Sequence, residues 1–264
     1  MNEKGLYVAL QYHPGTAVFS SPDGVADDKL MSAIHLSTLV LSTCANVAEV
    51  RAKLAEVVVW PYVLGPMGMA PPCHFVFHDV FGACIAVEWD AGEMKIYDNP
   101  FGVFTNSPEF TWHTTNLRNY THLSPDNPAV LTVAGQKLAP FGVGQGMQGL
   151  PGDNSSPSRF VRAATYVATA PEQADAAAAQ HEVFHMMNNF DIPDGFSASG
   201  EGAGVDDVTY WTSISNLADL TYNVRTVKDS TYRQVTLSDL DFTATAAKSV
   251  DLPSDPAFAP FPGL

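Results

Sequence analysis

The order of strand-like and helix-like segments is the feature of this chain that most limits its fold. Strand patterns, in which apolar residues alternate or run together between turn residues, cover residues 6–12, 73–80, 84–89, 94–97, 208–215, 220–227 and 232–237. Apolar residues at helical spacing cover residues 27–43, 46–56, 158–169 and 172–188. Two groups of strands and two pairs of helices predict an α+β fold in which two sheets lie between two helical layers.

Two stretches rich in turn-forming residues separate these segments. Residues 60–72 are predicted to form a loop, and residues 100–157 a long irregular segment of the kind that often carries function. Asn46 followed by Glu49 is typical of a capping box at the start of a helix. The chain has no internal repeat and no linker long enough to divide it, so residues 1–264 are expected to form a single domain.

The composition of the chain excludes several functional classes. Hydrophobic residues make up 46% of the 264 residues and charged residues 16%, which supplies a sizeable core and argues against disorder. The net charge of −15 repels phosphate groups, so no nucleic-acid partner is expected. No apolar run reaches the roughly 20 residues that span a bilayer, so no membrane span is expected. The first residues lack a signal-peptide pattern, which favours the cytoplasm; a periplasmic location stays open if Met1 is not the native N-terminus.

The three cysteines, Cys44, Cys73 and Cys84, give an odd and sparse count without paired spacing. Such a count argues against a disulfide scaffold and against a cysteine-rich zinc site. We interpret all three as small buried hydrophobic side chains.

The run His181-Glu182-Val183-Phe184-His185 matches the zinc-binding spelling H-E-x-x-H. On a helix the two histidines share one face, where they could bind zinc with Glu182 as the base. A third ligand is needed, but no histidine follows His185, and Glu201 lies in a glycine-rich loop. Because Met186 and Met187 come next, we interpret this segment as the buried face of a core helix. Zinc hydrolysis is a remote alternative.

The run Gly144-Gln145-Gly146-Met147-Gln148-Gly149 matches the dinucleotide-binding spelling G-x-G-x-x-G. A dinucleotide site needs a strand before this run and a helix that opens at its end. Here Leu150-Pro151-Gly152-Asp153 follows and continues the loop. The glycines are therefore expected to allow tight backbone bends.

Four stretches carry the strongest functional indication, because they occur together in a fixed order. They are Asn2-Glu3-Lys4-Gly5-Leu6; Tyr97-Asp98-Asn99-Pro100 leading to Thr105-Asn106-Ser107-Pro108; Asn116-Leu117-Arg118-Asn119-Tyr120; and Gly142 to Arg162. The most specific part is the run Gly152-Asp153-Asn154-Ser155-Ser156-Pro157-Ser158-Arg159-Phe160. On these residues the chain resembles the penicillin V acylase and choloylglycine hydrolase family over essentially its whole length.

This resemblance implies an N-terminal-nucleophile hydrolase with an αββα four-layer sandwich fold. Family members hydrolyse the C–N bond of linear amides with a cysteine at the mature N-terminus, whose α-amine can act as the base. A thioester forms and is hydrolysed, and fixed donors hold the oxyanion. The resemblance implies no cofactor and no metal, and a small acyl amide as the substrate. Relatives are often tetramers, so a homo-oligomer is expected.

Three positions match site residues of the family. Asn106 matches the side-chain donor to the oxyanion; its alternative is a plain turn asparagine. Arg159 matches the arginine beside the nucleophile, where a permanent cation favours the thiolate; its alternative is a surface salt bridge at a helix start. Tyr12 matches the position whose backbone N–H completes the oxyanion hole; its alternative is an aromatic residue packed at a strand end.

Tyr12 also bears on the substrate. Bile-salt hydrolases tend to carry asparagine at this position, whereas penicillin V acylases of the Gram-positive type tend to carry tyrosine. The resemblance therefore favours penicillin V-like aryloxyacyl amides or N-acyl homoserine lactones over conjugated bile acids.

The chain departs from the family at its start, because the matching stretches begin at Asn2 and no N-terminal cysteine precedes them. The family's first strands and nucleophile are therefore expected to be missing, so that this chain is a fragment without activity of its own. The missing strands would expose a sheet edge, and the fragment is expected to be prone to aggregation. The alternative is a non-catalytic relative that binds acyl amides.

Overall fold

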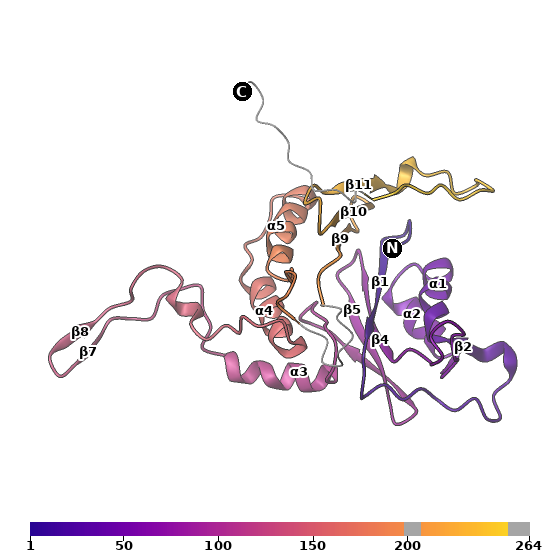
Figure 1. The fold of residues 1–264 in the computed structure, drawn as a ribbon, viewed down its shortest axis with the longest axis horizontal. Coiled ribbons are helices and arrows are strands. Elements are labelled where there is room, and N and C mark those ends of the chain that lie inside the picture. Colours follow the sequence, from indigo (N-terminus) through magenta and orange to yellow (C-terminus); the bar gives the residue numbers. More distant parts are fainter. Residues whose placement is uncertain (198–206, 253–264) are drawn as a thin grey trace, which may run out of the picture. The chain divides into compact units, whose positions relative to one another are not determined.

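The computed structural model describes residues 1–197 and 207–252 (Figure 1). The chain divides into two compact units. The larger unit is Val8–Glu172, and the smaller unit combines Met1–Tyr7 with Gln173–Leu264. In the two described ranges, every helix is too short or too polar to span a bilayer.

A four-stranded sheet forms the centre of the larger unit. β4 (Cys73–Asp79), β5 (Cys84–Asp90) and β6 (Glu93–Asp98) form an antiparallel meander, and β1 (Leu6–Tyr12) lies beside β4. Residues of β4 and β5 are buried on both faces, whereas β1 and β6 are mostly half-buried. The structure confirms the four strands predicted for this part of the chain. They could be predicted because their apolar patterns end at turn residues.

Side chains pack against both faces of this sheet. Ala86 of β5 lies in a buried cluster with Phe110 of α3 (Phe110–Asn116) and Phe160 of α4 (Ser156–Thr169). Trp89 meets Phe75 edge-on with ring centroids 5.9 Å apart. Successive residues of a strand point to opposite faces, so this aromatic pair lies on the face opposite Ala86.

The helix predicted over residues 27–43 begins later than expected. Before it come a 3-10 turn (Asp27–Lys29) and β2 (Leu30–Ser32), and the helix α1 covers only Ala33–Thr43. β2 pairs in parallel with β3 (Val58–Trp60). The early part of the prediction is wrong because strand pairing with a distant segment overrides the local helical spacing.

The second helix, α2 (Val47–Leu54), begins as predicted. The Asn46 side chain accepts a 3.0 Å hydrogen bond from the Glu49 N–H. The Glu49 carboxylate reaches back and accepts a 2.8 Å hydrogen bond from the Ala45 N–H. Asn46 satisfies a backbone donor that the first helical turn leaves unpaired, and Glu49 satisfies the donor just before the cap, which confirms reciprocal capping at this helix start.

Asp79, at the end of β4, is a buried carboxylate that joins two elements. It accepts a 2.9 Å hydrogen bond from the N–H of Val47, the first residue of α2. It also accepts hydrogen bonds of 3.0 and 3.1 Å from the N–H groups of Phe81 and Ala83, in the turn to β5. One side chain therefore caps the helix and closes the β4–β5 hairpin.

Residues 121–150 form an arm that extends from the rest of the larger unit (Figure 1). Its tip is a hairpin of β7 (Leu131–Val133) and β8 (Gln136–Leu138), and every residue of both strands is exposed. This hairpin and α3 correct the prediction that residues 100–157 are irregular throughout. Positive φ angles at Ala134 and Gly135 make the tight turn between the two strands. The strands were not predicted because they bury no face, so their sequence has no alternation of apolar and polar residues long enough to indicate a strand.

The base of the arm closes around Gly146, the middle glycine of the G-x-G-x-x-G run. Its carbonyl accepts a 3.0 Å hydrogen bond from the Ser124 N–H, and a Cβ at this position would lie 2.0 Å from the Asp126 carbonyl oxygen. Only glycine fits such a close approach. The run contains a single 3-10 turn, Gln145–Met147, and opens no α-helix, as the sequence predicted.

The described part of the smaller unit contains one α-helix and one antiparallel sheet. The helix is α5 (Ala176–Asn188), and the sheet has the order β11 (Arg233–Thr236), β10 (Thr221–Thr226), β9 (Trp211–Asn216). Phe184 of α5 stacks on Tyr232 with ring centroids 4.0 Å apart. The helix predicted over residues 172–188 begins later, at Ala176. Asp175 caps its start by accepting a 2.8 Å hydrogen bond from the Ala178 N–H. The three predicted strands are confirmed, and the class is mixed α+β.

Candidate active site

A tightly bonded turn precedes α4. The Asp153 carboxylate accepts hydrogen bonds from the Ser155 N–H at 2.9 Å and the Ser158 hydroxyl at 2.6 Å. Hydrogen bonds from Ser155 and Ser158 lower the pKa of Asp153 to about 2. The buried Arg162 guanidinium donates to two carbonyls of the same turn. The turn therefore fixes the direction in which Arg159 leaves the first turn of α4.

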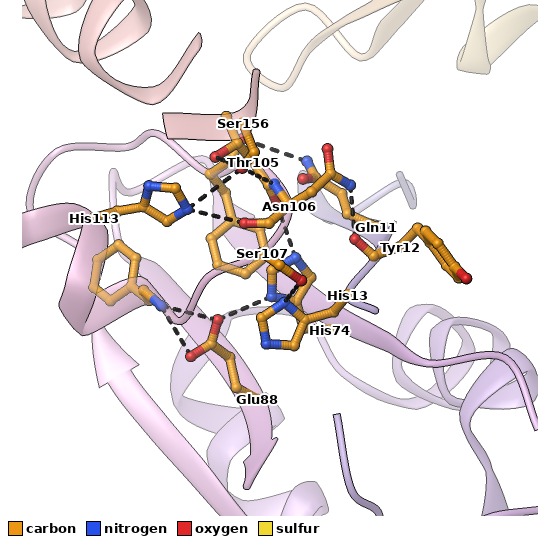
Figure 2. Close-up of polar contacts among 12 residues, drawn as sticks. Gln11, Tyr12, His13, His74, Glu88, Thr105, Asn106, Ser107, His113 and Ser156 are labelled. Atoms are coloured by element: carbon orange, nitrogen blue, oxygen red, sulfur yellow. Dashed lines mark hydrogen bonds and ion pairs between the residues drawn. The ribbon is translucent and has the colours of Figure 1, made fainter. Parts of the chain in front are cut away.

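Arg159, Asn106 and Tyr12 form a chain of contacts. Nη2 of Arg159 donates a 2.7 Å hydrogen bond to Oδ1 of Asn106. Nδ2 of Asn106 donates a 2.7 Å hydrogen bond to the carbonyl of Tyr12 (Figure 2). The structure thus brings together all three residues that the sequence singled out, from α4, the segment after β6 and the end of β1. Their catalytic roles stay a prediction.

The Asn106 carboxamide has a defined orientation and one further donor. Because Oδ1 accepts from Arg159, Nδ2 is the donor end of the amide. One of its two hydrogens points to the Tyr12 carbonyl, and the other has no acceptor within the described ranges. The Tyr12 side chain is 54% exposed, so this residue joins the site through its backbone. A fixed N–H of this kind suits a developing oxyanion.

Side chains that sequence reasoning missed hold the backbone around Asn106 (Figure 2). The Asn106 N–H donates to the Ser156 hydroxyl oxygen at 3.0 Å, and the Asn106 carbonyl accepts from Nε2 of His113 at 2.9 Å. The carbonyl of the preceding residue, Thr105, accepts from Nε2 of His74 at 2.8 Å. Elements β4, α3 and α4 therefore each contribute one side chain that fixes this short segment.

His74 is paired with Glu88, and both side chains are almost fully buried. Nδ1 of His74 lies 2.9 Å from Oε1 of Glu88, and the carboxylate also accepts from the Phe110 N–H at 3.1 Å. The register that pairs Phe75 with Val87 places His74 opposite Glu88 on neighbouring strands. That register is the signal from which the pair could have been found.

His13 stacks on His74 with ring centroids 4.0 Å apart and planes 13° apart. The Ser107 hydroxyl donates to the Pro14 carbonyl at 2.7 Å, so its 3.1 Å contact with Nδ1 of His13 needs the proton on Nδ1. Nε2 of His13 is then an unprotonated buried atom, without a hydrogen-bond partner in the described ranges. Burial, with His74 as a second cause, lowers the pKa of His13 to about 4, so the ring is neutral at pH 7.

Comparison with known proteins decides the family. Residues 1–252 match the family model described as linear amide C-N hydrolases, choloylglycine hydrolase family. The chain belongs to the choloylglycine hydrolase family. The resemblance inferred from the Gly152–Phe160 run and its companion stretches is confirmed.

Relatives of this choloylglycine hydrolase family member cover most of its length. The conjugated bile acid hydrolase of Lactobacillus acidophilus is 31% identical over 246 residues, which are 93% of this chain and 77% of that protein. The structure of a variant of the conjugated bile acid hydrolase from Clostridium perfringens matches with a TM-score of 0.88 at 25% identity, over 98% of this chain and 78% of that one. The penicillin V acylase from Agrobacterium tumefaciens shares the fold, with a TM-score of 0.70 at 20% identity over 91% and 66%.

Two of the three cysteines of this choloylglycine hydrolase family member, Cys73 and Cys84, are poor nucleophiles. Cys44 and Cys73 are buried as predicted, whereas Cys84 is half-buried. Burial raises the pKa of Cys73 and of Cys84 to about 12, so neither carries a thiolate at neutral pH. Cys84 lies 3.4 Å from Nε2 of His78, outside the contacts that surround Asn106.

A buried group in this family member has the composition of a metal site but not the geometry. Within the described ranges, His13, His74 and Glu88 offer ligand atoms within 4.8 Å of one another. However, the two imidazole rings are nearly parallel, and the lone pairs of parallel rings do not converge on one ion. Both nitrogens of His74 are also engaged, by Glu88 and by the Thr105 carbonyl.

The H-E-x-x-H run lies on α5. His181 and His185 stack 5.1 Å apart on one side of the helix, as the spacing predicts. The helix has no buried residue, so the prediction of a buried core face is wrong; the other side of α5 is half-buried. No third ligand lies beside the two histidines in residues 1–197 and 207–252, and Glu201 falls outside those ranges.

Proposed function

We propose that this protein hydrolyses the C–N bond of a linear acyl amide. The observation that carries the proposal is the contact chain from Arg159 through the Asn106 carboxamide to the Tyr12 carbonyl, in a member of an amide hydrolase family. It orients one neutral N–H donor and places a permanent cation behind it, which suits an oxyanion.

In the proposed reaction, the nucleophile is an N-terminal cysteine thiolate that is not among residues 1–264. It attacks the amide carbonyl, and the oxyanion accepts hydrogen bonds from Nδ2 of Asn106 and the N–H of Tyr12. The amine leaves with a proton from the α-ammonium group, and water hydrolyses the thioester. The raised pKa values of Cys73 and Cys84 support a nucleophile outside this chain.

We propose aryloxyacyl amides such as penicillin V, or N-acyl homoserine lactones, as the preferred substrates, because tyrosine occupies position 12. A second candidate is hydrolysis of conjugated bile acids. It is favoured by the similarity of this chain to the conjugated bile acid hydrolase of Lactobacillus acidophilus. The αββα four-layer stacking and the single domain are proposed with the enzyme, on the same resemblance.

The first experiment is to read the gene upstream of the Met1 codon in frame. We expect an open frame that reaches a cysteine, either after a start methionine or after a signal peptide. The extended protein is then assayed with penicillin V, an acyl homoserine lactone and a glycine-conjugated bile acid, with the 264-residue chain as the control. Equal hydrolysis by both proteins would contradict a nucleophile outside the chain. Tight substrate binding without hydrolysis by the extended protein would favour the non-catalytic relative.

The remote alternative, a zinc hydrolase, is separated by the same assay. It requires activity that is lost with a chelator and with His181→Ala. The amidase requires neither loss, because the proposed reaction uses no metal and His181 takes no part in it.

The family resemblance implies a homo-oligomer, and on that basis we also propose that the arm docks on a second copy of this chain. Phe141 and Val143 are fully exposed, and Leu131, Val133 and Leu138 are more than half exposed. Apolar side chains gathered on one projecting segment mark an interaction surface. Light scattering should give an oligomer for the extended protein, and Phe141→Ser with Val143→Ser should lower its mass to that of a smaller species. An unchanged mass would contradict this role of the arm.

A further inference from the structure

We infer that Glu88, His74 and His113 are positioning residues that aim the Asn106 carboxamide. The inference rests on the proposed function, in which this carboxamide contacts the reacting group. None of the three residues contacts the substrate in the proposed reaction. They act through the backbone on either side of the Cα of Asn106.

The first step is the direction of two hydrogen bonds. A carbonyl oxygen only accepts, so Nε2 of His74 and Nε2 of His113 must both carry hydrogens. They bind the consecutive carbonyls of Thr105 and Asn106, at 2.8 and 2.9 Å. Two fixed carbonyls, with the Asn106 N–H fixed by Ser156 between them, determine the backbone dihedrals from which the carboxamide extends.

The second step is that one carboxylate connects both imidazoles. Glu88 contacts Nδ1 of His74 directly. It also accepts from the N–H of Phe110, the first residue of α3, which carries His113 one turn later. Loss of this carboxylate would release His74 and the start of α3 together.

The third step is burial. His74, His113 and Glu88 are each 3% exposed or less, so water cannot replace a lost hydrogen bond without structural change. His13 stacks on His74 and Phe160 stacks on His113, at centroid distances of 4.0 and 4.7 Å. Both imidazoles are therefore held in plane while they donate, and the Asn106 segment has little freedom to move.

Four substitutions in the extended enzyme, His74→Phe, His113→Phe, Glu88→Gln and Glu88→Ala, test this arrangement. His74→Phe and His113→Phe keep a buried ring and remove the donor, while Glu88→Gln keeps hydrogen bonds to both partners. We expect the two Phe variants to lower kcat about 10- to 100-fold with KM changed less than about threefold, since small misplacements of catalytic groups have effects of this size. Glu88→Gln should retain most of the rate that Glu88→Ala loses.

Phe75→Leu is the matched control, because Phe75 is buried next to His74 in the chain but faces the other side of β4. We expect it to lower the melting temperature while kcat stays close to that of the parent enzyme. In an Asn106→Ala background, His74→Phe and His113→Phe should cost little further rate, because their effect passes through the missing carboxamide. Full additivity, or an equal loss of kcat in Phe75→Leu, would overturn the inference.

A structural readout separates this inference from the proposed function. Crystal structures of His74→Phe and His113→Phe should show the 2.7 Å contact between Nδ2 of Asn106 and the Tyr12 carbonyl lengthened or lost. If the parent enzyme hydrolyses no acyl amide, the proposed function fails, and this distance alone decides the positioning. An unchanged Asn106 carboxamide in both variants would overturn it.

Discussion

The Asn106 side chain donates to the carbonyl of Tyr12, a residue 94 positions earlier in the chain. The same carboxamide accepts from Arg159, which lies 53 positions later. The site therefore exists only when β1, the segment after β6 and α4 are all in place. The contacts with Arg159 and Tyr12 leave one N–H of the Asn106 carboxamide without an acceptor in the described part of the chain, and we propose that this N–H binds the oxyanion.

Arg159 is the residue whose replacement tests the contact chain most directly. Its Nη2 binds Asn106 while its Nε binds the Asn154 carbonyl at 3.0 Å, so both ends of the guanidinium are used. Lysine carries one donor group and cannot hold both partners. We expect Arg159→Lys in the extended enzyme to lose about 10- to 100-fold in kcat/KM. Asn106→Ala should lose about 100- to 1,000-fold in kcat, as removal of one oxyanion donor does.

Steady-state kinetics on the best substrate measures both losses. Arg51→Lys is the control, because Arg51 lies on α2 and contacts Asp98 rather than Asn106. Arg159→Lys with the same kcat/KM as Arg51→Lys would contradict the role given to Arg159.

Asp153 should make stability depend on pH in the acid range. Its pKa is lowered from 3.8 to about 2 by the hydroxyls and N–H of the turn before α4. A lowered carboxyl pKa stabilises the folded state above the unfolded pKa, and this stabilisation is lost as pH falls from about 4 to about 2. Asp153→Asn should therefore lower the melting temperature at pH 5 and differ less from the parent at pH 2. A pH-independent difference would show that charge is not the cause.

His13 should also make stability fall as pH falls, but over a higher pH range than Asp153. Burial lowers its pKa from 6.5 to about 4, so between these values the unfolded chain binds a proton that the folded chain does not. Stability is therefore lost as pH falls from 6.5 to 4, by at most about 3 kcal/mol. Denaturant unfolding of His13→Phe should show a smaller loss over this range, because the stacked ring is kept and the titrating group is removed. An equal loss in both proteins would contradict the assignment.

Gly146 should tolerate no side chain. In Gly146→Ala the Cβ would meet the Asp126 and Ser124 carbonyl oxygens, so the base of the arm must open. We expect a cost of about 1–3 kcal/mol, typical of overpacking, confined to the arm. Limited proteolysis should cut residues 121–150 faster, while the rest of the larger unit stays protected. Gly142→Ala is the matched control, since a Cβ there meets nothing within 4 Å and should leave cleavage unchanged.

The meander could be predicted because its central strands are apolar runs bounded by turns, such as Cys84–Asp90. The helix α3 could not, because it is short and polar, and its first N–H is satisfied by Glu88 from a distant strand. The arm hairpin buries nothing, so it has no pattern to recognise.

Some residues of the candidate site could likewise be predicted from the sequence, and others could not. Asn106, Arg159 and Tyr12 were found through a family resemblance, and the structure explains their proximity. His74 and Glu88 were missed because the role of a buried polar residue in a strand can be recognised only when the residue opposite it on the neighbouring strand is known. That neighbour depends on the pairing register, which the turn between β4 and β5 sets together with the strand pattern, and no register was predicted from the sequence.

Asp79 binds partners at very different distances along the chain. Phe81 and Ala83 are two and four residues away, whereas Val47 is 32 residues away. Closing a short loop costs less chain entropy, so the β4–β5 hairpin is expected to form around the carboxylate before α2 docks during folding. Loss of the Val47 contact should then mainly speed unfolding, while loss of the turn contacts should slow refolding. We therefore expect this single carboxylate to take part in both an early and a late event of folding.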